Sequence, residues 1–531
     1  MDYSLDDYVK HIGSLHQDDQ VDACTEQQMM TTLDAASSDS NKRRRQHAST
    51  HIISLSHRIV GNAGLDRLVD ALLNAQERQI QKKRRLRIDS NSSSSSSSLQ
   101  NDNDDDNVVR LANRIYLRCT NIKRGIHSLA SLISRSNSTE VLDLSQNELG
   151  NEGITEFCHE ISSQLHEQSL LHSLFLRNCQ ISCRGVMAIA SLLKPQCHEL
   201  AWAPLPIKTL DLSRNDIGND GIAALAEAIS WEGCSLQALD LSRCGITHER
   251  SRGLSDLCSA ILSKARRHAA VASTSLSYAF TTQSFVENYS NNLVTLKLNC
   301  NDLGESTFTA IAACIAGDSF VDCNNGSIVQ HCCPSLTNLY LNDTNMSSAS
   351  ATKLAKALAT NTGLKIMNIS GNSIDDDALK SFAYALRSNR TLSQLLFGRS
   401  KYITQKGVEA LANCVYDERH TAVLLSLAAS NHTITDFGLG NQTSIRLEHA
   451  LQFNCSDNDG CSIQRKKIVS FLNRDCRRTV HHFAAMFAAD HQHGNKVGRS
   501  TALPFVVSNC YLSCAFEMVR GMPESCFRTV Q

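Results

Sequence analysis

The chain has 531 residues, and its 52 lysines and arginines nearly balance 53 aspartates and glutamates, for a formal net charge of −1. A balanced charge argues against a polyanion-binding surface over the whole molecule, while local patches remain open. No run of 18 uncharged apolar residues occurs, so no membrane span is expected. Without a secretory leader, the 21 cysteines predict free thiols in a reducing, intracellular compartment.

The first hundred residues alternate low-complexity and periodic segments. Residues 1–50 combine an acidic start with the basic run KRRR at 42–45, and we predict a mostly disordered segment. Residues 51–88 read as a divergent first repeat that ends in a second basic run, KKRRLR, at 82–87. Residues 89–107, DSNSSSSSSSLQNDNDDDN, predict a disordered insertion, because the composition is Ser/Asp-rich and the charge is of one sign.

A strand-turn-helix unit then repeats over residues 108–436. Its most regular copy, TLDLSRNDIGNDGIAALAEAIS at 209–230, places an LDL strand before Asn215 and a helix after it. Apolar residues recur along that helix at the spacing of one buried face. A single copy would leave both its strand and its helix half exposed, so the copies have to stack. The first apolar strand residues of the copies are Leu142, Leu174, Leu210, Leu239, Leu296, Leu339, Met367 and Leu395.

The spacing of these copies indicates where the array is interrupted. Leu339, Met367 and Leu395 are 28 residues apart, which is the basic period, and longer steps indicate insertions. Two insertions are expected as loops beyond helices, near residues 266–291 and 317–334. Residues 437–531 lose the pattern and predict a helical C-terminal cap, with a small effector domain as the alternative.

The unit LDLSRNDIGNDGIAALAEAI resembles the ribonuclease-inhibitor type of leucine-rich repeat, and the resemblance covers roughly residues 51–435. It implies an α/β solenoid, a horseshoe with parallel inner strands and outer helices. Similar repeats occur in Ran GTPase-activating proteins and in NOD-like receptors. The nucleotide-binding Gly-Lys-Ser/Thr loop of NOD-like receptors does not occur in this sequence.

Alternation along the strands predicts which side chains face the concave surface of such a horseshoe. Aromatic residues there would anchor a partner, with flanking charges beside them. We expect the binding residues to be Tyr116, Asp143, Phe175, Arg177, Asp211, Asp240, Lys297 and Tyr340. Because LDLS is the repeat consensus, the three aspartates have an alternative interpretation as residues that only bond neighbouring strands.

We therefore predict a non-enzymatic scaffold that binds a protein partner on the concave face. The alternative is a regulator of a small GTPase, similar to Ran GTPase-activating proteins. That family carries an arginine early in a repeat helix; Ala223 fills the slot in the most regular copy, and Arg252 fills it in a later one. No catalytic residue, metal ligand or cofactor is expected, since no residue set with suitable spacing stands out.

The identity of the partner stays open from the sequence. A membrane is not expected, and nucleic acid is disfavoured by the balanced charge. The basic runs at 42–45 and 82–87 leave nuclear import and nucleic-acid contacts as alternatives. The expected compartment is the cytoplasm, with the nucleus as the alternative.

Overall fold

The computed structural model describes residues 52–91, 113–123, 126–136, 139–164, 170–194, 205–248, 252–275, 293–321, 328–331, 335–417, 426–427, 429–455, 463–464, 466–468 and 470. The chain divides into two compact units. The first unit comprises Met1–Ile181 and Pro195–Ile207, and the second comprises Ser182–Lys194 and Lys208–Gln531. The expected disordered segments at 1–50 and 89–107 lie outside the described residues, except for the last turn of one helix.

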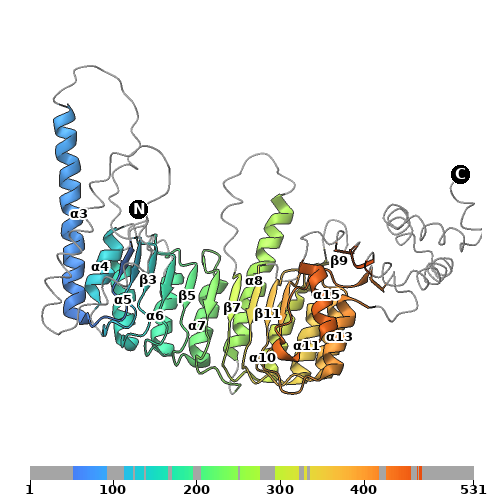
Figure 1. The fold of residues 1–531 in the computed structure, drawn as a ribbon. Helices are drawn as coiled ribbons and strands as arrows, with labels where there is room; N and C mark the ends of the chain where they lie inside the picture. Colours follow the sequence, from blue (N-terminus) through green and yellow to red (C-terminus); the bar gives the residue numbers. More distant parts are fainter. Residues whose placement is uncertain are drawn as a thin grey trace, which may run out of the picture. The chain divides into compact units, whose positions relative to one another are not determined.

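In the first unit, short parallel strands alternate with helices (Figure 1). The strands pair in chain order, from β1 to β4. The elements are β1 (Ile52–Ser54), α3 (Gly61–Asn91), β2 (Arg114–Tyr116), α4 (His127–Ser136), β3 (Val141–Asp143), α5 (Gly150–Gln164) and β4 (Ser173–Phe175).

The second unit continues the same alternation. Its parallel strands follow the order β5-β6-β7-β10-β11-β12. The elements are α6 (Cys183–Leu193), β5 (Thr209–Asp211), α7 (Gly218–Ser230), β6 (Ala238–Asp240), α8 (Arg252–Ser275), β7 (Thr295–Lys297), α10 (Glu305–Ala316), β8 (Asp318–Val321), β9 (Ile328–His331), β10 (Asn338–Tyr340), α11 (Ser348–Leu358), β11 (Ile366–Asn368), α12 (Asp376–Leu386), β12 (Gln394–Leu396), α13 (Gln405–Val415), the 3-10 turn η3 (Gly440–Gln442) and α15 (Ile445–Cys455).

Each repeat buries one side of its strand and one stripe of its helix. In β11 the central residue Met367 is fully buried, and its two neighbours are half-buried on the opposite side. Helix α12 begins after Asp375, whose side chain accepts the amide of Ala378 at 2.9 Å as an N-cap. Leu379 and Phe382 then lie on the buried face, as the helical period requires. These features confirm the leucine-rich-repeat solenoid that the sequence predicts.

A buried polar side chain holds the turn that ends each strand. Asn372 donates to the carbonyls of Leu341 and Ile369, both at 2.8 Å, and accepts the amides of Thr344 and Met346, both at 3.0 Å. Each such asparagine therefore bonds its own turn and the turn of the preceding repeat. Asn147 and Asn301 make the same set of bonds.

Cysteine replaces asparagine in two of these turns. The thiols of Cys179 and Cys244 donate to Leu144 O at 3.2 Å and Leu212 O at 3.3 Å. The amide of Cys244 is already bonded by Asn301 of the following repeat, at 2.9 Å. Each cysteine thus keeps one side-chain bond to the preceding repeat, and the two buried thiols are structural residues of these turns. Burial raises the pKa of the Cys244 thiol to about 12, so the thiol stays neutral.

The insertions contain more regular structure than loops. Helix α8 continues to Ser275, well past residue 266, where a loop was expected. The second insertion contains an antiparallel hairpin of β8 and β9. Helix α3 likewise runs to Asn91, past the expected end of its repeat at 88.

The array also extends beyond its expected end at residue 436. Leu395 donates its amide to Asp436 O at 3.0 Å, and Phe397 donates to Phe437 O at 2.9 Å, as between neighbouring strands. Helix α15 then packs on α13 in the place of a further repeat helix. The sequence pattern missed this copy because DFGL replaces the usual strand residues. Of the predicted cap, the structure describes 437–455 and a few residues between 463 and 470.

Buried asparagines after the helices form a second row that reaches this extra copy. Asn431 donates to Leu386 O and Asn389 O, and accepts the amides of Thr433 and Ile434, all within 2.9 Å. Asn454, at the end of α15, donates to Ile434 O at 2.6 Å. The row consists of Asn361, Asn389, Asn431 and Asn454.

Candidate partner-binding surface

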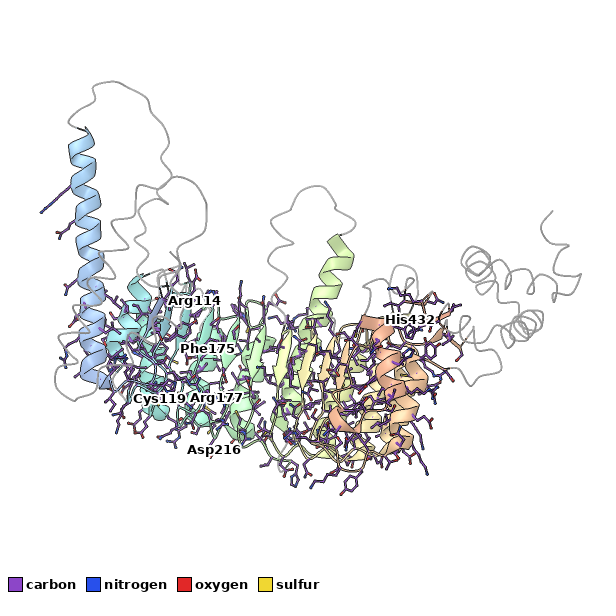
Figure 2. The ribbon with its side chains drawn as sticks, viewed as in Figure 1. Arg114, Cys119, Phe175, Arg177, Asp216 and His432 are labelled. Atoms are coloured by element: carbon purple, nitrogen blue, oxygen red, sulfur yellow. The ribbon has the colours of Figure 1, made fainter. Side chains whose placement is uncertain are left out.

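The strand face is the set of side chains that flank the buried central residue of each strand and point away from the helices. In the first unit, the strand register aligns Tyr116, Asp143 and Phe175 in one row. All three are half-buried. The predicted residue Arg177 lies two residues beyond Phe175, on the same side of its strand (Figure 2). The structure therefore groups four of the predicted residues.

In the second unit, the register aligns the other four predicted residues, Asp211, Asp240, Lys297 and Tyr340. Lys297 lies between Asp240 and Tyr340 in this row. Its Nζ is 3.3 Å from Asp240 Oδ2 and 5.9 Å from the centre of the Tyr340 ring. The lysine charge is thus compensated by an ion pair and a cation–π contact within the face.

The three aspartates of the strand face have a local structural task. Each uses Oδ1 to accept the backbone amide two residues further along the chain. The distances are 2.9 Å from Ser145 to Asp143, 2.9 Å from Ser213 to Asp211 and 3.0 Å from Ser242 to Asp240. The bonds close the turn at the end of the strand, as Asx turns do. These bonds lie within one repeat, and Asp240 in addition pairs with the neighbouring strand through Lys297, as the alternative interpretation expects.

Arg252 is separate from the strand face. It is the first residue of α8 and is exposed. It therefore belongs to the helical side of its repeat, whereas Asp240 belongs to the strand of that repeat. Nothing in the described residues brings Arg252 together with the eight strand-face residues.

Sequence reasoning missed Arg114. It precedes Tyr116 by two residues in β2, so both side chains are on the strand face. Figure 2 labels Arg114 on the strands of the first unit, together with Phe175 and Arg177. The alternation rule that identified Tyr116 also identifies Arg114, because the residue two positions earlier in a strand points to the same side.

The described residues offer no metal-binding group of three or more His, Cys, Asp or Glu side chains. No described helix combines the length and apolar character of a membrane-crossing segment. The described thiols that lie deepest in the core are not activated, since burial raises the pKa of Cys414 to about 12, as it does for Cys244. The strand face can therefore offer aromatic surface, guanidinium groups and amides for binding.

Known proteins resemble this chain over parts of its length. A family model described as a leucine-rich repeat matches residues 140–158 and 206–226. The ribonuclease inhibitor of Sus scrofa is 25% identical over 341 residues, 60% of this chain and 70% of that protein. The ribonuclease inhibitor of Mus musculus is 23% identical over 298 residues, 56% of this chain and 53% of that protein. None of these names denotes an enzyme, in agreement with the expectation of a non-enzymatic protein.

Two further similarities are local or weak. NACHT, LRR and PYD domains-containing protein 12 of Mus musculus is 33% identical over 129 residues, 24% of this chain and 11% of that protein. The solved structure of a TLR13-ssRNA13 complex matches with a TM-score of 0.32 and 13% identity, over 57% of this chain and 35% of the other. The chain thus spans about half of the mouse inhibitor and about a tenth of the NACHT protein.

Proposed function

We propose that this chain, a leucine-rich-repeat protein with repeats of the ribonuclease-inhibitor type, is a non-enzymatic scaffold that binds a protein partner on its strand face. One observation carries the proposal: the strand face presents half-buried aromatic and charged side chains in register. Rigid aromatic side chains with few rotatable bonds are favoured anchors of protein interfaces. The proposed compartment is the cytoplasm, with the nucleus as the alternative.

The test compares partners captured by the wild-type chain and by Phe175→Ala/Tyr340→Ala. Loss of each anchor should remove about 1 to 3 kcal/mol of binding free energy, enough to deplete specific partners several-fold in quantitative mass spectrometry. The matched control is Tyr384→Ala/Tyr402→Ala, because those tyrosines are 78% and 61% exposed and lie off the strand face. An unchanged partner set in the folded Phe175/Tyr340 variant overturns the strand-face assignment.

The alternative function, regulation of a small GTPase, rests on Arg252. An arginine that completes the transition state of GTP hydrolysis has to reach the nucleotide, and Arg252 is exposed at the start of α8. Single-turnover GTP hydrolysis by small GTPases captured with the chain measures this directly. Acceleration that disappears in Arg252→Ala supports the alternative, and no acceleration excludes it.

A further inference from the structure

The strand face of the first unit carries arginines without a matching set of acids. Arg114, Val141 and Ser173 form one row across β2, β3 and β4. Tyr116, Asp143 and Phe175 form the next row. A third row lies two residues further along each strand and consists of Arg118, Ser145 and Arg177. It is aligned by two backbone hydrogen bonds, from Cys119 N to Ser145 O and from Gln146 N to Arg177 O. Arg114 and Arg177 thus occupy opposite corners of this grid, with Asp143 at its centre.

Both corner arginines have a buried hydrogen-bond donor that is unused. The Nε atoms of Arg114 and Arg177 are buried and have no hydrogen-bond partner among the described residues. Asp143 does not supply one: it accepts the amide of Ser145, and no described ion pair joins it to either arginine. Arg118 is different, since its Nε donates to Gln146 Oε1 at 3.0 Å.

In the second unit, the positive charge on the strand face is paired within the chain. There Lys297 has Asp240 at 3.3 Å and the ring of Tyr340 at 5.9 Å. Among the described residues the corner arginines of the first unit have no such partners, so two guanidinium groups without an acidic partner there flank the row of Tyr116 and Phe175. A guanidinium group without an acidic partner can gain charge-assisted hydrogen bonds when a ligand brings a carboxylate to it.

We infer that the strand face of the first unit binds an extended acidic segment of a partner protein, with one carboxylate on Arg114, another on Arg177, and an apolar residue against Tyr116 and Phe175. The inference rests on the proposed strand-face function and specifies the chemistry of its partner. Carboxylates fit because the planar guanidinium offers them paired N–H donors.

Spacing and the central Asp143 favour a peptide over a nucleic acid. Strand geometry places Arg114 and Arg177 about 13 Å apart along the strands and about 10 Å across them. An extended peptide spans this distance with about five residues, and leaves uncharged residues over Asp143. A nucleic acid carries a phosphate at every nucleotide, and so places a negative charge against Asp143.

The chain contains an acidic run of its own shortly before β2 in the sequence. Asp102, Asp104, Asp105 and Asp106 precede β2, and only seven residues separate Asp106 from Arg114. A segment of that length reaches about 25 Å when extended, which is enough to span the grid. The experiment therefore has to distinguish a partner segment from this run.

The experiment measures fluorescence anisotropy of a labelled 12-residue peptide of Glu and Ser with one central Leu, added to the full chain. The same peptide with Gln in place of Glu is the reference, and single-stranded dT12 is the nucleic-acid probe. We expect the Glu peptide to bind, and to weaken about tenfold or more with Arg114→Gln or Arg177→Gln. Arg214→Gln and Arg243→Gln are matched controls, since these arginines are exposed in turns of the second unit, and they should leave the affinity unchanged.

Several outcomes overturn the inference. Equal binding of the Glu and Gln peptides removes the role of charge, and tighter binding of dT12 replaces the peptide by a nucleic acid. Binding of the Glu peptide only after Asp102, Asp104, Asp105 and Asp106 are changed to Asn assigns the face to the chain's own run. If the Glu peptide fails while Phe175→Ala/Tyr340→Ala still loses cellular partners, the acidic partner is wrong and the strand-face function stands.

Discussion

Lys467 shows how much a single residue can depend on its tertiary surroundings. Its side chain is completely buried, and its Nζ donates to Asn431 O at 2.7 Å and Val415 O at 2.9 Å. The Nδ1 atom of His432 lies 3.1 Å from the same nitrogen. Burial lowers the pKa of Lys467 to about 7; the nearby Cys414 opposes this shift, and Arg390 adds to it. Lys467 thus caps the carbonyl groups left at the end of α13 and its following loop.

The pKa of Lys467 predicts a pH dependence of stability. An unfolded lysine has a pKa of about 10.4, so between about pH 7 and 10.4 the unfolded chain binds one more proton than the folded chain. The contribution of Lys467 to stability therefore rises with pH across this window, and it is lost as pH falls through the window to the folded pKa of about 7. From pH 7 to 8, Lys467→Met should lose about 1 kcal/mol of the rise seen in the wild type, measured by urea unfolding.

The adjacent Lys466, which is exposed, provides the control. Lys466→Met should keep the wild-type pH dependence. The buried cysteines do not obscure the comparison, because both variants retain them and their contribution is the same in both. An unchanged slope in Lys467→Met contradicts the assignment.

At the scale of the element, the turn after each strand is the part of the repeat that the sequence specifies best. The residue before the buried asparagine has a left-handed backbone at Gln146, Arg214 and Gly371, with φ of 62°, 60° and 72°. A non-glycine residue is tolerated there because the asparagine bonds hold the turn from inside. The asparagine is therefore a stronger signal of the repeat than the glycine beside it.

Removal of one such asparagine should be costly. Asn372→Ala leaves the carbonyls of Leu341 and Ile369 and the amides of Thr344 and Met346 without their partner. We expect a loss of about 3 kcal/mol in unfolding free energy, measured by urea denaturation and circular dichroism. Asn338→Ala is the control, because its side chain makes one bond, to Thr295 Oγ1 at 3.0 Å, and should cost about 1 kcal/mol or less. Equal losses in the two variants contradict the role of the turn.

At the scale of the whole molecule, each repeat helix in the second unit packs chiefly on its neighbours in sequence, α10 on α11, α11 on α12 and α12 on α13. Aromatic rings continue the core from one repeat to the next: Phe382 lies 5.3 Å from Phe397, which stacks on Phe437 at 6.3 Å. Stability in such a solenoid is the sum of repeat terms and nearest-neighbour terms. A defect in one repeat should therefore stay local.

Phe382→Ala tests this property. Removal of a fully buried ring should cost about 3 to 5 kcal/mol. Hydrogen-exchange mass spectrometry should show faster amide exchange in α11, α12 and α13, and unchanged exchange in α4 and α5 of the first unit. Tyr384→Ala, an exposed position of the same helix, should change neither region. Uniform acceleration across both units contradicts nearest-neighbour stability.

The sequence by itself determined the repeat, because everything within one repeat is local. The LxL strand, the asparagine that follows it and the helical stripe lie within fewer than 30 residues of sequence, and the same pattern recurs along the chain. The sequence also predicted which side chains share the strand face, since strand alternation is a local rule. It missed the last copy, where DFGL breaks the pattern, and the hairpin of β8 and β9 within an insertion.

Only the tertiary structure decided how charges on that face are paired. Lys297 and Asp240 are 57 residues apart, with an insertion between them, yet their side chains lie 3.3 Å apart. Arg114 and Arg177 are separated by one complete repeat, and whether an acid reaches either of them depends on the packing of adjacent strands. Lys467 looks like any surface lysine in the sequence until the fold buries it. Pairing and burial are long-range properties, and local sequence patterns do not contain them.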